Sequence, residues 1–493
     1  MSLSTYVEAL RSGQKPRFPA DADSVAFAKT LDQQDRLRHL RDEFILPSKA
    51  SLRKRALDGT LPAQVDRSEH TIGREPNGHV TASEQQAIYL VGNSLGAQPR
   101  AIRRHIDAQL ETWASLGVNG HFTELVDSPL TQWQDLAENC ARASADIVGC
   151  APHEIVIMNT LSVNLHLMMA SFYRPSGRRN KVILEWKPFP SDHYVIESQV
   201  RWHGLDPAEC MVKLEPDVGS ALIPTEKVLA AIDRHADDAA LLLLPGIQYY
   251  SGQLFDMAAI TARARAHGIV VGWDLAHAAG NVELRLHDWD VDFACWCTYK
   301  YLNAGPGAIA GCFVHERHGF VRPGQPLDYR PRLAGWYGGD KSVRFNMDTL
   351  FVPSPGASGF QLSNPSAIDL ASLAGALSVF AKTSMRDLRS KALVLTAYLE
   401  HLLLQHASST TGEPFFRIIT PSDPAQRGTQ LSLLLREGLL EPVTRALEEN
   451  GVACDKRKPD VIRVAPVPLY CSFHDVWTFV QILRGALDGD DAR

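Results

Sequence analysis

The sequence is poor in cysteine and lacks the spacing that would indicate disulfides or a zinc site. Eight cysteines are scattered over 493 residues, several of them inside apolar runs, whereas small disulfide-stabilised domains concentrate them in a short chain. Cys295 and Cys297 form a CxC pair in a predicted buried strand, and no second Cys or His pair stands at zinc spacing. We therefore expect free thiols, no metal and a reducing compartment.

Long hydrophobic runs are also missing. The longest, near residues 239–244, stops at Pro245 and is far too short to cross a bilayer. Residues 1–7 lack the basic start and apolar core of a signal peptide. These two observations predict a cytoplasmic protein.

Charge of one sign is not in large excess. The formal net charge is -6 and the isoelectric point is near 6.3, which gives no electrostatic case for nucleic acid or an anionic membrane as a partner. A hydrophobic content of 45% with 22% charged residues is ordinary for a globular protein, and the length allows two domains.

Apolar, β-prone runs alternate with amphipathic helical patterns through the middle of the chain. Strands are expected at 154–158, 181–186, 239–244, 268–273 and 291–296, with helices between them. This alternation predicts an α/β protein with a mostly parallel sheet. Before it, residues 27–40 have the pattern of a helix, and 53–80 read as a polar loop or insertion without an assigned function.

Two of the predicted strands end in charged residues. Asp274 follows one buried strand, and Tyr299 and Lys300 follow the next, just before a Gly-Pro-Gly loop. A lone Asp or Lys is usually a surface charge, but the carboxyl ends of buried parallel strands are where α/β sheets place ligands. We therefore predict that Lys300 forms a Schiff base with pyridoxal 5'-phosphate and that Asp274 keeps the pyridine nitrogen protonated.

Three further segments have a structural and a functional interpretation. The turn at 92–96 joins a strand to a helix and could also face a ligand with Ser94. Residues 159–162 precede a helix, so they are N-caps that could also bind a phosphate. Phe189 lies in a loop held by two prolines, where an aromatic ring can plug the core or stack on a flat ligand. His166 lies in the predicted helix that follows residues 159–162 and is expected to be packed rather than catalytic.

Taken together, these segments resemble kynureninase, a pyridoxal-phosphate family of the aminotransferase-like fold type I. The similarity runs from about residue 88 to 476. Its most specific motifs are residues 89–96, 189–192, 273–284, 292–305 and 463–470. The resemblance implies a large domain at 87–350 with a mostly parallel seven-stranded sheet, and a small α+β domain at 351–493. An N-terminal helical segment, 1–86, would precede them.

The resemblance also assigns roles to individual residues. Lys300, Tyr299 and Asp274 would be catalytic. The cofactor would be bound by Leu161, Ser162, Phe189, Asp192, Asp274, His277, Tyr299, Lys300, Trp336 and Asn364. The substrate would be bound by Ser94, His121, Asn364 and Arg463. No metal is implied. Trp336 and Asn364 would reach the site across a homodimer interface, and Arg463 would hold the substrate carboxylate with its two-pronged guanidinium.

The activity implied is hydrolytic Cβ–Cγ cleavage of L-kynurenine or 3-hydroxy-L-kynurenine to L-alanine and the matching anthranilate, a step of tryptophan degradation and of NAD biosynthesis. His121 and Asn364 match the pair that surrounds the aryl ring in animal and fungal relatives, which favours the 3-hydroxy substrate. Pro245 departs from the family, since some relatives have a serine there, and one hydrogen bond to the cofactor is therefore in question.

Two other interpretations fit part of the pattern. Another fold type I enzyme, such as an aminotransferase or a cysteine desulfurase, would share the lysine and aspartate. A desulfurase needs a mobile catalytic cysteine, and no cysteine of this chain stands in a convincing exposed glycine-rich loop. A non-catalytic scaffold that kept the fold would have no need of Lys300, Asp274, Tyr299 and Arg463 together.

Overall fold

The computed structural model describes residues 2–53, 86–347, 349–407 and 414–491, so the polar segment expected at 53–80 lies almost wholly outside the described residues. The chain forms two compact units. Unit 1 contains residues 1–98, 250–252 and 386–493, and unit 2 contains residues 99–249 and 253–385. Each unit is described separately below.

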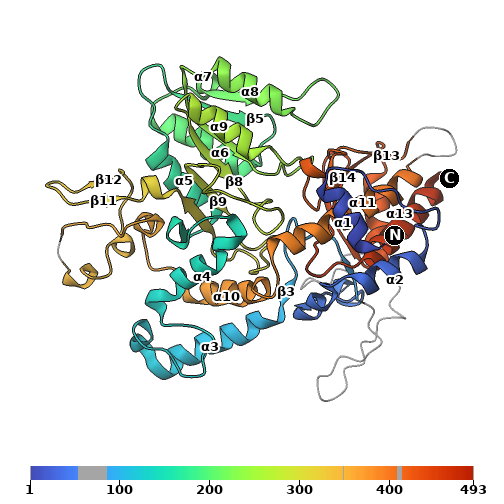
Figure 1. Cartoon of the computed structure of the whole chain (residues 1–493), viewed down its shortest axis with the longest axis horizontal. Coiled ribbons are helices and arrows are strands. Elements are labelled where there is room, and N and C mark those ends of the chain that lie inside the picture. The colour runs from blue at the N-terminus through green and yellow to red at the C-terminus, as the bar shows by residue number, and fades with distance from the viewer. Residues whose placement is uncertain (1, 54–85, 348, 408–413, 492–493) are drawn as a thin grey trace. The chain divides into compact units, whose positions relative to one another are not determined.

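Unit 2 is built on a seven-stranded sheet with the strand order β4-β10-β9-β8-β7-β5-β6 (Figure 1). The strands are β4 (Ile155–Ile157), β5 (Lys181–Glu185), β6 (Met211–Leu214), β7 (Ala239–Pro245), β8 (Val270–Asp274), β9 (Phe293–Trp296) and β10 (Gly311–Val314). Only β10 runs against its neighbours, β4 and β9. The predicted α/β class and mostly parallel sheet are confirmed.

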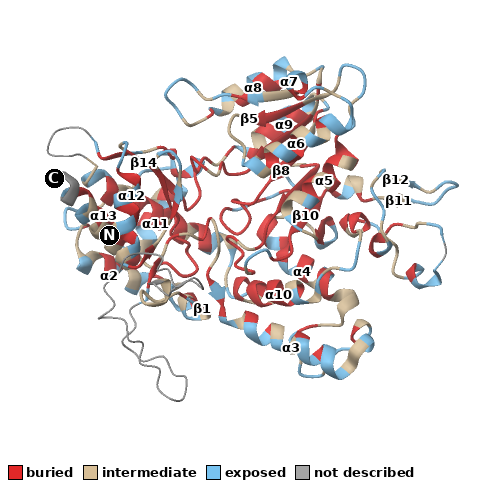
Figure 2. Cartoon of the chain, turned by 180° about the vertical axis from the view of Figure 1, so that it is seen from behind, coloured by how far each residue is buried: buried red, intermediate tan, exposed pale blue. Residues whose placement is uncertain are grey.

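Helices cover this sheet, so most residues of its strands are buried, and β4, β9 and β10 are buried along their whole length (Figure 2). They are α3 (Arg100–Leu116), α4 (Trp133–Val148), α5 (Leu161–Phe172), α6 (Pro190–Trp202), α7 (Pro207–Cys210), α8 (Thr225–Arg234), α9 (Met257–Ala266) and α10 (Ala367–Phe380). Helix α10 packs on α3 and α4, and α5 packs on β9. Two short strands, β11 (Val321–Arg322) and β12 (Asp328–Tyr329), form a separate hairpin.

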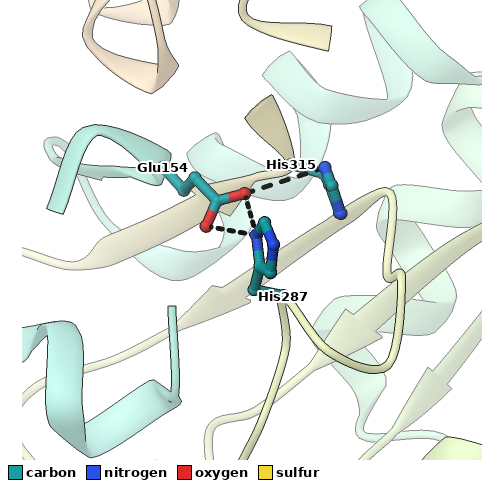
Figure 3. Close-up of side chains that lie close together, drawn as sticks. All are labelled: Glu154, His287 and His315. Atoms are coloured by element: carbon teal, nitrogen blue, oxygen red, sulfur yellow. Dashed lines mark hydrogen bonds and ion pairs between the residues drawn. The ribbon is translucent and has the colours of Figure 1, made fainter. Parts of the chain in front are cut away.

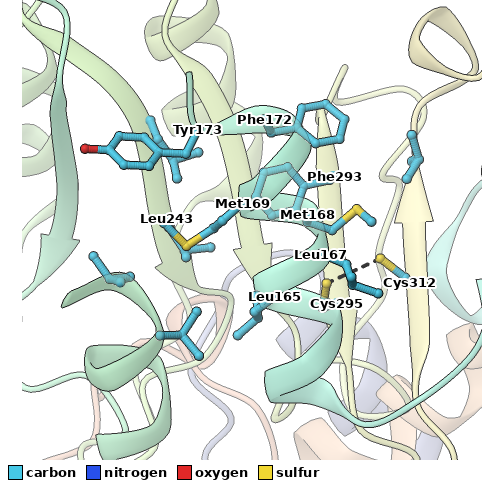
Figure 4. Packing of buried hydrophobic residues seen from close by; sticks show 14 of the residues in the cluster. Leu165, Leu167, Met168, Met169, Phe172, Tyr173, Leu243, Phe293, Cys295 and Cys312 are labelled. Atoms are coloured by element: carbon cyan, nitrogen blue, oxygen red, sulfur yellow. Dashed lines mark hydrogen bonds between the residues drawn. The ribbon is translucent and has the colours of Figure 1, made fainter. Parts of the chain in front are cut away.

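The core of unit 2 lies where α5 meets the sheet (Figure 4). Met168 and Phe172 of α5 are buried together with Phe293, Cys295 and Cys312 of the central strands. The thiols of Cys295 and Cys312 come from paired positions of β9 and β10 and lie 3.4 Å apart. They pack as small hydrophobic groups, and all eight cysteines are free. This core fixes both the start of α5 and the ends of β8 and β9.

Unit 1 joins the N-terminal segment to the C-terminal part of the chain. Its helices are α1 (Leu3–Arg11), α2 (Val25–Gln34), α11 (Met385–Gln405, with Met385 itself in unit 2), α12 (Leu440–Glu449) and α13 (Phe473–Asp491). An antiparallel sheet has the order β13 (Phe416–Ile418), β14 (Leu431–Leu435), β17 (Val461–Val464), β16 (Asp455–Arg457). The short strands β2 (Ile88–Tyr89) and β15 (Val452–Ala453) pair in parallel. Strands β1 (Phe44–Ile45) and β3 (Gln98–Pro99) complete the set.

Buried polar contacts explain why the N-terminal segment belongs to this unit. Lys391 on α11 forms an ion pair with Asp35 at 2.7 Å, with both side chains about 5% exposed or less. The Tyr398 hydroxyl donates to the carbonyl of Ala22. The described part of the segment expected as a separate region at 1–86, residues 2–53, therefore shares a core with residues beyond 386. The expected boundary near residue 350 lies inside unit 2.

The helix expected at 27–40 is shorter in the structure. It runs from Val25 to Gln34 and is followed by a 3-10 turn at Arg38–Glu43. Asp35 ends the helix, because its carboxylate accepts a hydrogen bond from the backbone N–H of Leu37 and pairs with Lys391. An Asx-type contact of this kind competes with the helical ladder.

Candidate active site

The two charged residues that follow the central strands lie at the same edge of the sheet. Asp274 is the last residue of β8, and Lys300 stands four residues after the end of β9, its parallel neighbour. The two residues are 6% and 9% exposed. The carboxyl ends of adjacent parallel strands thus place a buried carboxylate and a buried amine together.

Both side chains line one cavity within unit 2. Its wall is made by Thr160, Leu161, Ser162, Glu185, Phe189, Ser191, Asp192, Pro245, Ile247, Tyr249, Asp274, Ala276, His277, Tyr299 and Lys300. Eight of the ten residues expected to bind the cofactor are in this set. The structure therefore brings most of the predicted site together in one place.

The Lys300 amine lies among a histidine and two aromatic rings. Its Nζ is 3.2 Å from Nε2 of His277, 5.8 Å from the ring centre of Phe189 and 5.9 Å from that of Tyr299. The amine is buried and its reach is limited by these rings, so it points into the cavity rather than to solvent. The amine is thus placed for covalent chemistry on a carbonyl group.

Asp192 on α6 meets Asp274 in the same cavity. Burial, the Asp274 charge and a hydrogen bond to Asp274 hold the pKa of Asp192 well above its usual range, and the nearby Lys300 opposes this only in part. Asp274 accepts the backbone N–H of Ala276 at 2.7 Å, whereas Oδ1 of Asp192 is buried without a partner. The proton of the pair therefore belongs to Asp192 and the negative charge to Asp274. A partnerless buried oxygen beside a charged carboxylate suits a ligand with a protonated ring nitrogen.

Two helix N-termini border the cavity. Helix α5 begins after Thr160 and α6 after Phe189, and neither cap residue closes its helix with a side-chain hydrogen bond. The hydroxyls of Ser162 and Ser191, in the first turns of these helices, are hydrogen-bonded to each other. Uncapped N–H groups, two hydroxyls and two positive dipole ends together suit a phosphate. The residues present thus fit both ends of a phosphorylated pyridine such as pyridoxal phosphate.

Tyr299 is the other polar group beside the amine. Burial is the largest cause that raises the pKa of its hydroxyl, followed by the neighbouring Cys297 thiol. The phenol therefore keeps its proton at neutral pH and acts as a donor.

Several residues of the cavity wall had no predicted role. Ser191 lies inside the family motif at 189–192. Glu185 is the last residue of β5, so the pattern that indicated Asp274, a charged residue at the end of an apolar strand, applies to Glu185 as well. Thr160 lies in the predicted cap segment at 159–162, and Ala276 lies in the motif at 273–284. No sequence pattern marks Ile247 and Tyr249, which also line the cavity.

The remaining predicted residues do not line this cavity. In unit 2, Trp336 is 51% exposed and bonds the carbonyl of Arg344, Asn364 is exposed, and His121 packs edge-on against Trp133 at 4.9 Å. Nδ1 of His121 is buried without a partner. Ser94 and Arg463 belong to unit 1.

Arg463 is held within its own unit. It lies on β17, is 1% exposed, and forms an ion pair with Asp455 on the adjacent strand β16. The pair fixes one side of a planar guanidinium and neutralises part of its charge. His166 on α5 contacts Gln199, as expected for a packed histidine, and does not line the cavity.

A second polar cluster lies at the opposite end of the strands. Glu154, just before β4, accepts hydrogen bonds from His287 at 2.9 and 3.0 Å and lies 3.7 Å from Nδ1 of His315 (Figure 3). It also accepts the backbone N–H groups of Ala151 and Glu316. The two imidazole rings are stacked 4.8 Å apart at 22°, so their in-plane lone pairs do not converge on one point. The cluster, in the part of the chain that the structure describes, is an ion-pair network rather than a metal centre.

Comparison with known proteins identifies the family. The model of the kynureninase C-terminal domain matches residues 388–483. Kynureninase 1 of Neurospora crassa is 64% identical over 99% of both chains, and a kynureninase of Pyricularia oryzae is 59% identical over 95% of this chain and 96% of its own.

Solved structures with the same fold are more distant in sequence. The cystine C-S lyase C-DES, in complex with cysteine persulfide, has a TM-score of 0.65 at 18% identity and covers 82% of this chain and 97% of its own. A cysteine desulfurase from Thermococcus onnurineus has a TM-score of 0.64 at 15% identity, covering 82% and 95%. These likenesses confirm the expected fold type I architecture. The near full-length identity decides between the families of that fold, and the chain belongs to the kynureninase family.

Proposed function

We propose that Lys300, Tyr299 and Asp274 carry out the reaction of this family in the cavity at the end of β8 and β9. The chain is a pyridoxal-phosphate-dependent hydrolase that cleaves the Cβ–Cγ bond of kynurenine and yields alanine and an anthranilate. The observation that supports this assignment of roles is that the Lys300 amine and the Asp274–Asp192 pair line one cavity, with two uncapped helix N-termini beside it.

We assign cofactor binding to residues of this cavity and two others. The N-termini of α5 and α6, with Leu161 and Ser162, bind the phosphate. Asp274 holds the charge of the ring nitrogen with Asp192 beside it, and Phe189 lies against the ring face. Trp336 and Asn364, which are exposed in one chain, complete the site from a second copy. The cofactor supplies the electron sink that stabilises negative charge on the substrate carbon.

The protein groups then move protons. Lys300 removes the Cα proton, since its amine is buried and has His277 at 3.2 Å to share a hydrogen. Tyr299, which stays protonated because burial raises its pKa, donates to the γ-carbonyl while water adds to it. The Cβ–Cγ bond breaks, and the anthranilate leaves with the oxygen of the added water in its new carboxyl group. Cβ takes up a proton to become the methyl group of alanine, and Lys300 returns a proton to Cα.

For the substrate, we assign the α-carboxylate to Arg463 and the aryl ring to Ser94, His121 and Asn364. The buried, partnerless Nδ1 of His121 supports a polar contact to the ring. A buried hydroxyl needs such a partner, which favours 3-hydroxykynurenine over kynurenine.

We further propose a homodimer in the cytoplasm that does not bind nucleic acid. Phe122, Trp336 and Phe345 are each at least half exposed. The ring centre of Phe345 lies 5.6 Å from that of Phe122 and 5.5 Å from that of Trp336. A contiguous exposed aromatic group is typical of a contact surface. Among the described residues, no helix is long and apolar enough to cross a membrane.

The direct test is to incubate the purified chain, loaded with pyridoxal phosphate, with kynurenine and 3-hydroxykynurenine and to quantify alanine and each anthranilate. We expect equal amounts of alanine and anthranilate. Lys300→Ala should lower kcat by at least about 10³-fold, because both covalent attachment and proton transfer are lost. Product formation by Lys300→Ala at the wild-type rate would refute the assignment.

A further inference from the structure

Glu185 is a buried carboxyl group of the cavity wall that the reaction described above does not use. It ends β5, is 1% exposed, and lines the same cavity as Asp192, Asp274 and Lys300. Three carboxyl groups and one amine thus line one cavity. Because buried carboxyls are costly, a third one calls for a specific reason.

The contacts of Glu185 tie together two loops of the wall. Its Oε2 accepts the backbone N–H of Lys187 at 2.6 Å, and its Oε1 accepts from the Gln248 amide at 3.3 Å. The same amide nitrogen donates to the carbonyl of Lys187 at 3.0 Å. Glu185 and Gln248 therefore hold the Lys187 residue by its N–H and its C=O at once.

The loop held in this way carries Phe189. That ring is 42% exposed, packs edge-on against Tyr249 at 5.4 Å, and lies 5.8 Å from the Lys300 amine. The position of Phe189 thus depends on two loops, at 186–189 and 246–249, and Glu185 joins them.

We propose that Glu185 is a positioning residue for the cofactor, which in its ionised form fixes the loop that places Phe189 against the pyridine ring. This inference rests on the cofactor site proposed above. An ionised carboxylate accepts both N–H bonds as charge-assisted hydrogen bonds, whereas protonation removes the charge and turns one acceptor oxygen into a donor. The loop is therefore held tightly only when Glu185 is charged.

The surroundings place this change near neutral pH. Burial raises the pKa of Glu185 to about 7, opposed by the Lys187 N–H, the Gln248 amide and the Lys187 amine. The other charged groups that face it are Glu215, after the neighbouring strand β6, and Asp192 on α6, whose raised pKa is due in part to Glu185.

The test compares the full-length wild type with Glu185→Gln, which keeps the shape and removes the charge. We expect pyridoxal phosphate to bind about tenfold more weakly to the variant at pH 8.5, where wild-type Glu185 is ionised. At pH 5.5 the wild-type acid is neutral like the amide, so the two dissociation constants should agree within about twofold. The visible circular dichroism of the bound cofactor should differ between the two proteins at pH 8.5 only.

A purely structural role would give a ratio of dissociation constants that does not change with pH, and that result would overturn the proposal. Glu215→Gln is the matched control, since Glu215 is exposed just after the adjacent strand and does not line the cavity. It should bind the cofactor like the wild type. Failure of the wild type itself to bind would refute the cofactor site rather than this inference.

A second measurement guards against misfolding. Because the pKa of Glu185 is higher in the folded chain than in the unfolded one, its contribution to stability is lost as pH rises through about 7. The cofactor-free variant should therefore have a higher Tm than the cofactor-free wild type at pH 8.5, although it binds the cofactor more weakly.

Gln248→Leu, which removes the second donor but not the charge, should also weaken binding at pH 8.5. Unchanged affinity in both Glu185→Gln and Gln248→Leu would overturn the proposal.

Discussion

At the scale of single residues, the two acids of the cavity are not equivalent. Asp274 carries the charge because the Ala276 N–H bonds it, and Asp192 carries the proton because it is buried next to Asp274. We expect Asp274→Asn to lower kcat by about 100-fold or more, since each pKa unit lost by the ring nitrogen is about tenfold. Asp192→Asn, which replaces a neutral acid by a neutral amide, should lower kcat less. Steady-state kinetics with kynurenine measures both, and a larger loss for Asp192→Asn would reverse the assignment.

The aryl pocket gives a second prediction at this scale. Replacing His121 by Trp and Asn364 by Thr removes the polar partners expected for the 3-hydroxyl group. The ratio of kcat/KM for 3-hydroxykynurenine to that for kynurenine should fall by about tenfold, because one buried hydroxyl loses its hydrogen bond. Each single variant should give part of the change. An unchanged ratio in the double variant would remove His121 and Asn364 from the aryl pocket.

These residues also show how far a sequence reaches. Asp274 and Lys300 were predictable because Asp274 ends one apolar strand and Lys300 follows the next within four residues. The cavity that the two side chains share follows from parallel pairing of β8 and β9. Glu185 ends a strand in the same way, but a lone carboxylate after an apolar run is usually a surface charge. Only the structure shows that it is 1% exposed.

At the scale of elements, the first turns of α5 and α6 meet at the cavity. Ser162 and Ser191 share a hydrogen bond across the two first turns. We expect Ser162→Ala and Ser191→Ala each to weaken pyridoxal phosphate binding by about tenfold, from the loss of one hydrogen bond to a charged group. Because the hydroxyls contact each other, the double variant should lose less than the product of the two effects. Equilibrium titration measures this, and fully multiplicative losses would show that the hydroxyls act independently.

The Glu154–His287 pair at the other end of the strands makes stability depend on pH. The hydrogen bond that His287 donates to Glu154 raises the pKa of His287, and the pKa of Glu154 is lowered by His287 and two backbone N–H groups in spite of its burial. The His287 contribution is lost as pH rises through its folded pKa, and the Glu154 contribution as pH falls through its own. The pair therefore stabilises most between about pH 4.5 and 6.5.

We expect His287→Gln to lower Tm more at pH 6 than at pH 8.5. The loss in the free energy of unfolding at pH 6 should stay below about 1 kcal/mol, because the His287 side chain is 40% exposed and its charge is screened by solvent. Thermal unfolding across this range measures it. His193→Gln, which removes a partly exposed helix-surface pair with Glu197, is the control and should change Tm little. An effect of His287→Gln that grows with pH would contradict the ion-pair interpretation.

The strands that the sequence did not predict have physical reasons to be missed. Met211–Leu214 is an edge strand that is only partly buried, so its apolar signal is weak. Gly311–Val314 is fully buried but follows a glycine-rich loop, and its antiparallel place between β9 and β4 depends in part on β4, which is far away in the chain.

At the scale of the whole molecule, the expected contact between two copies involves aromatic residues that are exposed in the single chain. Trp336 is expected to complete the site across a dimer, and in one chain it is exposed, next to Phe345 and then Phe122. The apolar surface of these three rings is removed from water only when another surface packs on it. A second copy of the chain, which would also supply Trp336 to the site, would cover this ring cluster.

Phe345→Glu should therefore convert the dimer to monomer and lower activity together, because a charge in the core of an apolar contact is unpaired and desolvated. Analytical ultracentrifugation of the loaded protein measures the first effect, and kcat/KM measures the second. Trp202→Glu is the control, since Trp202 is 86% exposed on α6, away from the ring cluster, and its replacement should change neither. If Phe345→Glu stays a dimer with full activity, the aromatic cluster is not the contact. If the wild type is an active monomer, Trp336 and Asn364 act within one chain or not at all.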